Sequence, residues 1–196
     1  MRLASLARLL LSSYVLACHP EVRAQPGLPA CEWCGAADAP ATLTAVARLT
    51  PADEPGERLI LDGRILQADG RTPAANVLLY AYQTDTTGAY PMRGGETGNG
   101  RRHGALRGWL RTGTDGRYRI ETIRPAPYPG RHTAAHIHVT LTPPGGSEGW
   151  LDDFVFSDDP LLSARERAGR GVVTLQRDAN GVLHATRDLR LSDVQR

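Results

Sequence analysis

The sequence has no lysine and no excess of charge of one sign. Its 196 residues include 23 basic and 21 acidic side chains, which give a formal net charge of +2. The two signs are interspersed, so no basic stripe follows a phosphate backbone, and we expect no nucleic-acid partner. The exclusive use of arginine is a compositional bias and indicates no function. The chain also lacks internal repeats, which excludes a solenoid.

The N-terminal apolar run is too short to cross a membrane. A span needs about 20 apolar residues, whereas the run at 9–17 follows a positively charged start and ends at a cysteine. This pattern predicts an export signal over residues 1–18. The stretch VLAC resembles a lipoprotein box that would lipidate Cys18, and cleavage after Ala24 is the alternative. We therefore expect an extracytoplasmic protein: periplasmic, attached to a membrane through Cys18, or secreted.

Cysteine is scarce, with three residues in all. If Cys18 carries lipid, Cys31 and Cys34 are left as a pair, for which a disulfide is the expectation in an oxidising compartment. A thioredoxin-like redox motif would need a strand before it and a helix after it, but the flanks are rich in glycine, proline and alanine. A zinc site would need a second pair of ligands. The disulfide is the favoured interpretation.

Helical periodicity is almost absent. Residues 19–57 are predicted to be a tether with the CxxC, and residues 58–192 a folded domain of short β-rich runs divided by turn signals such as Asp115-Gly116. Only residues 159–169 look helical. The pattern predicts an all-β fold, an antiparallel β-sandwich. The glycine-rich stretch 91–108 is long enough to indicate either a functional loop or disorder.

Two histidines share one face of a predicted strand. His136 and His138 project together, while Ile137, Val139 and Leu141 project to the opposite, core face. A pair of exposed imidazoles is one interpretation, and half of a transition-metal site is the other. His103 and His132 are candidate third ligands for zinc, although neither has a telling position.

Tyrosines supply further ligands. Tyr128 is held between Pro127 and Pro129, and Tyr90 stands at the start of the glycine-rich stretch. A phenolate is a hard anionic oxygen donor, and tyrosine ligates haem iron in catalase. Tyrosines beside the histidine pair therefore favour ferric iron.

Four stretches together resemble the intradiol ring-cleavage dioxygenases: YQTDTTGAYP, LRTGTDGRYRIETIRPAPYPGR, AHIHV and FVFSDDPLL, in that order from about residue 58 to 165. The resemblance implies the β-sandwich of that family. It also implies Fe(III) bound by Tyr90, Tyr128, His136 and His138, and catalysis in which the tyrosine in the Tyr128 position leaves the metal and takes up a proton from the substrate. The expected reaction opens a catechol-type ring between its two hydroxyls with O2 and gives a muconate-type diacid.

Arg131 follows Tyr128 and is either a fixed cation near negative charge developing on the substrate or an exposed loop residue. The helical dimerisation region of catechol-type relatives is missing, and an oligomer remains an open expectation. Other aromatic residues are assigned to packing: Tyr80, Tyr82 and Tyr118 to the core, and Trp109 and Trp150 to packing or to the wall of a ring-sized pocket. His103 is expected to be a solvated loop histidine, or to approach the substrate.

Two other classes of function are left open. The first is a non-catalytic binding module, because parts of the sequence also resemble transthyretin-like and carboxypeptidase-regulatory β-sandwiches. The second is zinc hydrolysis on the histidine pair. The set of two tyrosines and two histidines distinguishes the dioxygenase from both, since a binding module has no reason to assemble it.

Overall fold

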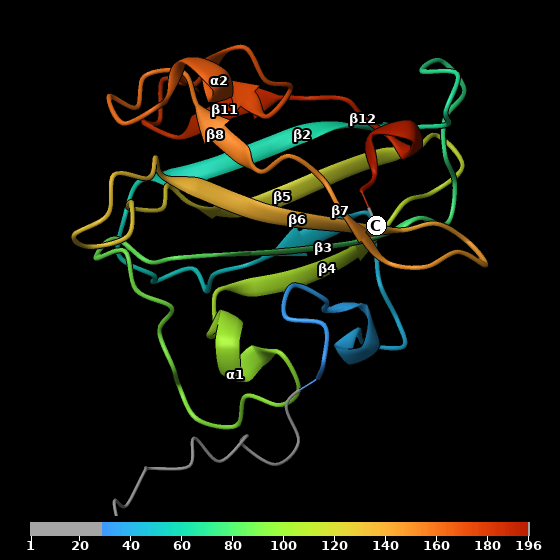
Figure 1. The fold of residues 1–196 in the computed structure, drawn as a ribbon, viewed down its shortest axis with the longest axis horizontal. Coiled ribbons are helices and arrows are strands. Elements are labelled where there is room, and N and C mark those ends of the chain that lie inside the picture. The colour runs from blue at the N-terminus through green and yellow to red at the C-terminus, as the bar shows by residue number, and fades with distance from the viewer. Residues whose placement is uncertain (1–28, 196) are drawn as a thin grey trace, which may run out of the picture.

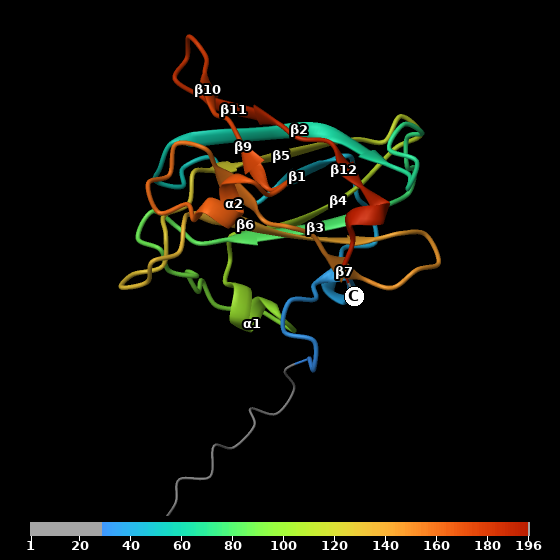
Figure 2. The ribbon, with the colours of Figure 1, turned by 45° about the horizontal axis from the view of Figure 1, so that its top comes forward.

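Two β-sheets packed face to face form the body of the protein. The computed structural model describes residues 29–195, and the predicted export signal lies outside them. Figures 1 and 2 show the two layers, with α1 and the segment that begins at residue 29 on the outside of the layer that holds β3 and β4. The prediction of a β-sandwich is confirmed.

The first sheet has six strands. Its strand order is β1-β5-β2-β11-β10, and β12 also pairs with β2. The bounds are β1 (Val46–Arg48), β2 (Arg58–Leu66), β5 (Arg117–Ile123), β10 (Gln176–Arg177), β11 (Leu183–Thr186) and β12 (Leu189–Arg190). The central β2–β5 pair is antiparallel, whereas β1, β11 and β12 join in parallel.

The second sheet also has six strands and carries the histidines. Its strand order is β4-β3-β6-β8-β9, with β7 on β6. The bounds are β3 (Leu78–Gln83), β4 (Arg107–Arg111), β6 (His136–Thr142), β7 (Gly149–Trp150), β8 (Phe154–Phe156) and β9 (Val172–Val173). Its central strands, β3 and β6, pair antiparallel, with Tyr82 opposite His138.

Helix is minor in the described part of the chain: α1 (Gly100–His103), α2 (Ala164–Arg167) and the 3-10 turns η1 (Ala36–Asp38) and η2 (Leu191–Asp193). α2 falls within the stretch predicted to be helical, and a capping box explains where it begins. The Ser163 hydroxyl accepts from the Glu166 N–H, while the Glu166 carboxylate accepts from the Ser163 N–H. Among the described residues, no helix has the length and apolar character needed to cross a bilayer.

The core lies between the sheets and follows the period-two alternation. Ile137, Val139 and Leu141 of β6 are at most 1% exposed and belong to one continuous apolar cluster. Tyr118 joins this cluster, as predicted, and its hydroxyl donates to the Arg187 carbonyl at 2.5 Å. Burial of these aliphatic side chains, each worth about 1.5–3 kcal/mol, is the main stabilisation of the fold.

The folded body begins before Arg58, which corrects the predicted tether. β1 pairs with β5 over Val46–Arg48, and Ala47 and Leu49 are buried in the core. Residues 31–38 also pack on the body, and Cys31 and Cys34 form the predicted disulfide. Residues 31–38 are held on the body by hydrogen bonds to loops. Such contacts leave no hydrophobic period in the sequence, so the composition indicated a tether.

A second, aromatic layer covers the outer face of the β3–β6 sheet. Tyr80 and Tyr82 are buried as predicted, but they point away from the core, toward α1 and the disulfide segment, residues 31–38. Tyr80 stacks on Trp109 and on Tyr82, with ring centroids 5.2 and 5.5 Å apart. This layer gives the histidine face of β6 a shielded environment.

Candidate metal centre

β6 supplies both imidazoles on its outer face. His136 and His138 alternate with the core residues, so the strand that anchors the sheet also fixes the spacing of the two rings. The Tyr82 ring stacks on His138 from the neighbouring strand, with centroids 4.5 Å apart. The side-chain direction predicted from the sequence is therefore confirmed.

Two turns bring the tyrosines to this face. The Thr84 hydroxyl donates to the Ala126 carbonyl at 2.7 Å, which ties the turn before Tyr90 to the proline-rich turn that carries Tyr128. Gly88 lies between them with a φ of 80°, and a Cβ there would be 2.1 Å from the Pro127 carbonyl oxygen. A glycine is required at this contact because any side chain would push the two turns apart.

The four polar tips converge. The Tyr90 and Tyr128 hydroxyl oxygens are 2.5 Å apart, and His138 Nε2 lies 3.1 Å from each of them. His136 Nε2 lies 3.2 Å from the Tyr128 oxygen and 3.1 Å from His138 Nε2. The side chains come from β6 and two separate turns, so the structure brings together all four residues that the sequence predicted as ligands.

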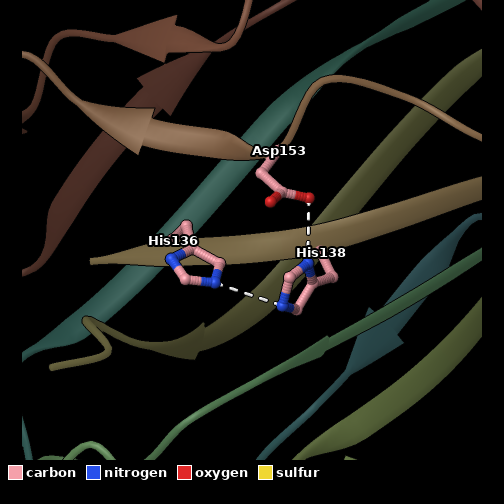
Figure 3. Close-up of side chains that lie close together, drawn as sticks. All are labelled: His136, His138 and Asp153. Carbon is pink, nitrogen blue, oxygen red and sulfur yellow. Dashed lines mark hydrogen bonds and ion pairs between the residues drawn. The ribbon is translucent and has the colours of Figure 1, made fainter. Parts of the chain in front are cut away.

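The outer nitrogens fix the tautomers of both rings. His136 Nδ1 lies 2.7 Å from the Ala134 carbonyl oxygen, and His138 Nδ1 lies 3.0 Å from Asp153 Oδ1. These acceptors require N–H groups at Nδ1, so each neutral ring directs the lone pair of Nε2 toward the other (Figure 3). Two lone pairs facing each other at 3.1 Å repel unless a cation lies near both.

This arrangement fits a metal ion. Five short contacts join the four atoms, and two phenol protons can serve at most two of them. In the remaining contacts lone pairs face each other with no proton between them, which a cation would relieve. Nitrogen and oxygen donors suit several transition metals, and anionic phenolates favour a hard ion such as ferric iron. The residues present therefore match the group that the resemblance implies.

Asp153 is the functional residue that the sequence reasoning missed. It forms a close trio with His136 and His138, but its carboxylate bonds the Nδ1 of His138, on the side away from the tyrosines. Its place is that of an outer partner that orients a ligand. The available signal was strand pairing, because the register of β6 on β8 sets His136 opposite Val155 and thus Asp153 near His138.

Burial favours the neutral forms of three residues of the metal-free cluster. Desolvation raises the pKa of the Tyr90 and Tyr128 phenols, and it lowers the pKa of His136, which is 8% exposed. Its hydrogen bond with Tyr128 further raises the pKa of Tyr90, because the bond favours the form in which Tyr90 keeps its proton. Both phenols therefore keep their protons until a bound cation replaces them.

The remaining candidates lie outside the cluster. His132 is exposed, and among the described residues no contact joins it to the four tips. Arg131 is exposed with its guanidinium carbon 5.9 Å from the Tyr128 ring centroid, and its electrostatic role stays a prediction. The expectation of a solvated His103 is wrong: it is 3% exposed, bonded at Nδ1 to the Tyr80 hydroxyl and at Nε2 to the Glu32 carbonyl, both at 2.7 Å.

Comparisons with known proteins agree with this geometry. The family model described as "Dioxygenase" matches residues 35–169, a span that holds all four predicted ligands. The chain belongs to the intradiol ring-cleavage dioxygenase family. The binding-module alternative is not favoured.

Three relatives show the extent of the similarity. The protocatechuate 3,4-dioxygenase beta chain of Burkholderia cepacia is 32% identical over 122 residues, which cover 55% of this chain and 48% of that protein. The dioxygenase domain of a dioxygenase–carbohydrate-binding fusion from Streptomyces sp. SirexAA-E is 31% identical, with a TM-score of 0.57 and coverage of 76% and 87%. Catechol 1,2-dioxygenase from Acinetobacter sp. ADP1 is 25% identical, with a TM-score of 0.59 and coverage of 78% and 58%.

The chain has the intradiol dioxygenase fold. The chain spans about half the length of the curated relatives it matches. Family membership implies a non-haem iron centre, and the cluster of Tyr90, Tyr128, His136 and His138 is where this chain places suitable donors.

Proposed function

We propose that the protein is a non-haem Fe(III) dioxygenase that opens a catechol-type ring between its two hydroxyls. The observation that supports this function best is the convergence of two phenol oxygens and two imidazole Nε2 atoms. The five short contacts among them are 2.5–3.2 Å long. Both atoms of O2 enter the muconate-type diacid, so the reaction needs no other reductant.

The donor set supports the ferric state. Tyr90 and Tyr128 would bind as phenolates, whose two negative charges in a partly buried site stabilise Fe(III) over Fe(II). His136 and His138 would complete the ligand set through Nε2. The chemistry that the iron supplies when bound is withdrawal of electron density from a chelated catecholate, which makes the ring reactive toward O2.

Tyr128 is the residue suited to exchange a proton with the substrate. It stands in a turn between two prolines and outside the sheet, whereas His136 and His138 are fixed by β6. Burial raises the pKa of its phenol, so a Tyr128 oxygen that is not bound to a cation would hold a proton taken from a catechol hydroxyl. Arg131, near its ring, would stabilise negative charge at this end of the site.

The test is the visible spectrum of the protein loaded aerobically with ferric iron. We expect a red-brown colour from phenolate-to-iron charge transfer, a change of that colour on anaerobic addition of catechol, and a ring-opened diacid after O2 is admitted. Tyr128→Phe should weaken the band. Tyr118→Phe is the matched control, because its hydroxyl lies in the core, bonded to the Arg187 carbonyl, and its loss should leave the colour intact.

Two results would contradict the proposal. One is a protein that retains iron stoichiometrically yet stays colourless. The other is colour that persists unchanged in Tyr128→Phe. A colourless zinc protein whose hydrolytic activity survives Tyr128→Phe would instead support the zinc alternative.

We also propose that the protein acts outside the cytoplasm, attached through a lipidated Cys18 or released after Ala24. The Cys31–Cys34 disulfide supports this location because such bonds persist in oxidising compartments. Mass spectrometry of the mature N-terminus from the native host distinguishes the two processing routes. Recovery of the unprocessed chain in the cytoplasm would overturn the proposal.

A further inference from the structure

A cavity adjoins the metal centre on the side of His138. It has a volume of about 290 Å³, and its wall includes Trp33, Tyr82, His138, Thr140, Trp150 and Asp153. His138 belongs to the predicted ligand set and forms part of the wall, so the cavity borders the place where a catechol would bind. A cavity of about 150 Å³ holds benzene, so this one has room for a ring substituent as large as a second ring.

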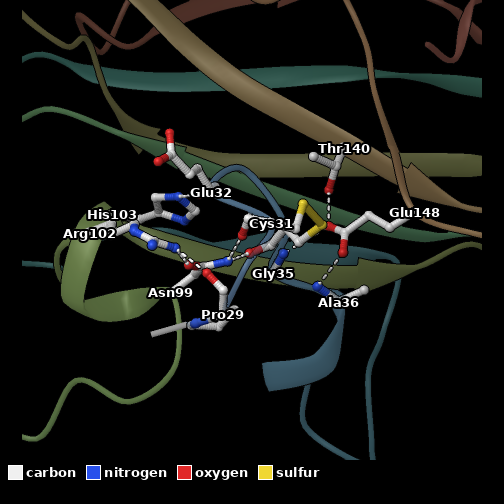
Figure 4. The surroundings of a disulfide bond; sticks show 11 residues. Pro29, Cys31, Glu32, Gly35, Ala36, Asn99, Arg102, His103, Thr140 and Glu148 are labelled. Atoms are coloured by element: carbon white, nitrogen blue, oxygen red, sulfur yellow. Dashed lines mark hydrogen bonds between the residues drawn. A yellow bond between two sulfur atoms is a disulfide. The ribbon is translucent and has the colours of Figure 1, made fainter. Parts of the chain in front are cut away.

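Trp33 comes from the segment between the two cysteines, which is held on the body from several sides (Figure 4). The Asn99 amide donates to the carbonyls of Cys31 and Cys34 at 2.7 and 2.5 Å. The Glu148 carboxylate accepts the N–H groups of Gly35 and Ala36 at 2.9 and 3.0 Å. The backbone on both sides of Trp33 is therefore fixed by distant parts of the chain.

The same carboxylate connects this segment to β6. Glu148 also accepts the Thr140 hydroxyl at 2.6 Å, two residues beyond His138. Gly35 lies so close to the sheet that a Cβ would be 2.2 Å from the Tyr80 ring. The disulfide segment is thus seated on the outer face of the sheet, with Trp33 beside the cavity.

The indole of Trp33 has no structural partner of its own. Within residues 29–195 it makes no hydrogen bond, and it is half-buried, whereas the indole of Trp109 donates to the Gly35 carbonyl at 2.7 Å. A large aromatic side chain that is positioned by its neighbours yet leaves a face free at a cavity is suited to contact a ligand.

Charge selects the kind of ligand. Among the lining residues there is no arginine, and Asp153 places a carboxylate at the wall. A negatively charged substituent would meet like charge and find no cation, whereas Trp33, Tyr82 and Trp150 offer aromatic surface. The occupant favoured by the wall is an uncharged aromatic group.

We propose that Trp33 forms the wall of a specificity subsite that takes an uncharged aryl substituent of the catechol. The proposal rests on the proposed function, since it places the two hydroxyls at the metal centre. It assigns the segment Cys31–Cys34, which precedes the matched family region, a role in choosing the substrate.

The experiment is an anaerobic binding titration, by calorimetry, of the iron-loaded protein with catechol, 4-phenylcatechol and 4-carboxycatechol. The parent should bind 4-phenylcatechol most tightly. Trp33→Ala should weaken that affinity about tenfold while changing the catechol affinity by less than about threefold. Trp33→Phe should restore most of the loss, and His184→Ala, on β11 of the other sheet, should change neither.

Iron content and circular dichroism of each variant show whether the fold and the centre are intact. Unchanged affinity of Trp33→Ala for 4-phenylcatechol, or a parent that prefers 4-carboxycatechol, overturns the subsite. The metal-free protein is titrated in parallel: if iron adds nothing to catechol affinity, the proposed function fails. In that case Trp33-dependent binding of 4-phenylcatechol to the metal-free protein still supports the subsite, and its absence overturns it.

Discussion

The two faces of the β3–β6 sheet use alternate residues of the same strands for different purposes. The inner face is aliphatic: Leu79, Ala81, Ile137, Val139 and Leu141. The outer face is aromatic and polar: Tyr80, Tyr82, His136, His138 and Thr140. The inner face is stabilised by burial, which tolerates exchange of similar shapes. The outer face depends on directed contacts, which do not tolerate such exchange. Mutations on the inner face should therefore change stability, and mutations on the outer face should change metal binding.

The sharpest test of this separation compares two adjacent residues of β6. His136→Ala should abolish iron retention, a loss of at least about a hundredfold in affinity, because it removes one of four ligands. Ile137→Ala should instead lower the free energy of unfolding of the metal-free protein by about 2–5 kcal/mol, because it leaves a cavity in the core. Iron content after desalting and urea unfolding followed by circular dichroism measure the two effects.

The metal-free protein is used for unfolding because bound metal would itself stabilise the native state. If His136→Ala unfolded the metal-free sheet as readily as Ile137→Ala, the separation would be wrong. In that case the histidines of β6 would be structural residues.

The difference between the faces also explains what the sequence could predict. The alternation of Ile137, Val139 and Leu141 is local, so the core face and the direction of the histidines followed from it directly. The convergence of Tyr90 and Tyr128 on those histidines is not local, and it was predicted only through the family resemblance. The local pattern alone favoured two exposed imidazoles over a metal site.

Residues whose partners lie far along the chain could not be assigned. Asp153 acquires its role from the pairing of β8 with β6. His103 is buried against the Tyr82 ring and the Glu32 carbonyl, which lie 21 and 71 residues away along the chain. The segment around Cys31 has no hydrophobic period, so its composition indicated a tether. Its packing depends on Asn99 and Glu148, which the sequence does not connect to it.

A smaller effect is expected where the outer face supports the ligands without touching the metal. Asp153→Asn keeps the shape of the side chain but removes the charge that holds the Nδ1 proton of His138. We expect iron affinity to fall about 10–100-fold, with the fold unchanged. Competition with a chelator gives the affinity. The matched control is Asp152→Asn, next in sequence but exposed, with a side chain outside the trio of His136, His138 and residue 153; an equal loss there would refute the specific role.

The smallest effect concerns the cover of the outer face and depends on pH. Burial lowers the pKa of His103 to about 4, and the nearby Arg107 and Arg102 also act against protonation. As a neutral ring it accepts the Tyr80 hydroxyl proton at Nδ1 and donates from Nε2 to the Glu32 carbonyl. Protonation would leave Nδ1 without a lone pair, so the contact to Tyr80 would have to change.

The sign of the pH effect follows from this lowered pKa. Between pH 6.5 and about 4 the unfolded chain binds the proton more readily than the folded one, so the folded state is fully stabilised above pH 6.5 and loses stability as the pH falls. We expect a loss of about 2 kcal/mol at pH 4 relative to pH 7 from this residue. His103→Gln, whose amide can contact both partners without titrating, should show a correspondingly flatter profile in urea unfolding of the metal-free protein. Identical profiles for the two proteins would mean that protonation of His103 does not change the stability of the fold. The acid sensitivity would then come from other groups such as His136, whose pKa is also lowered by burial.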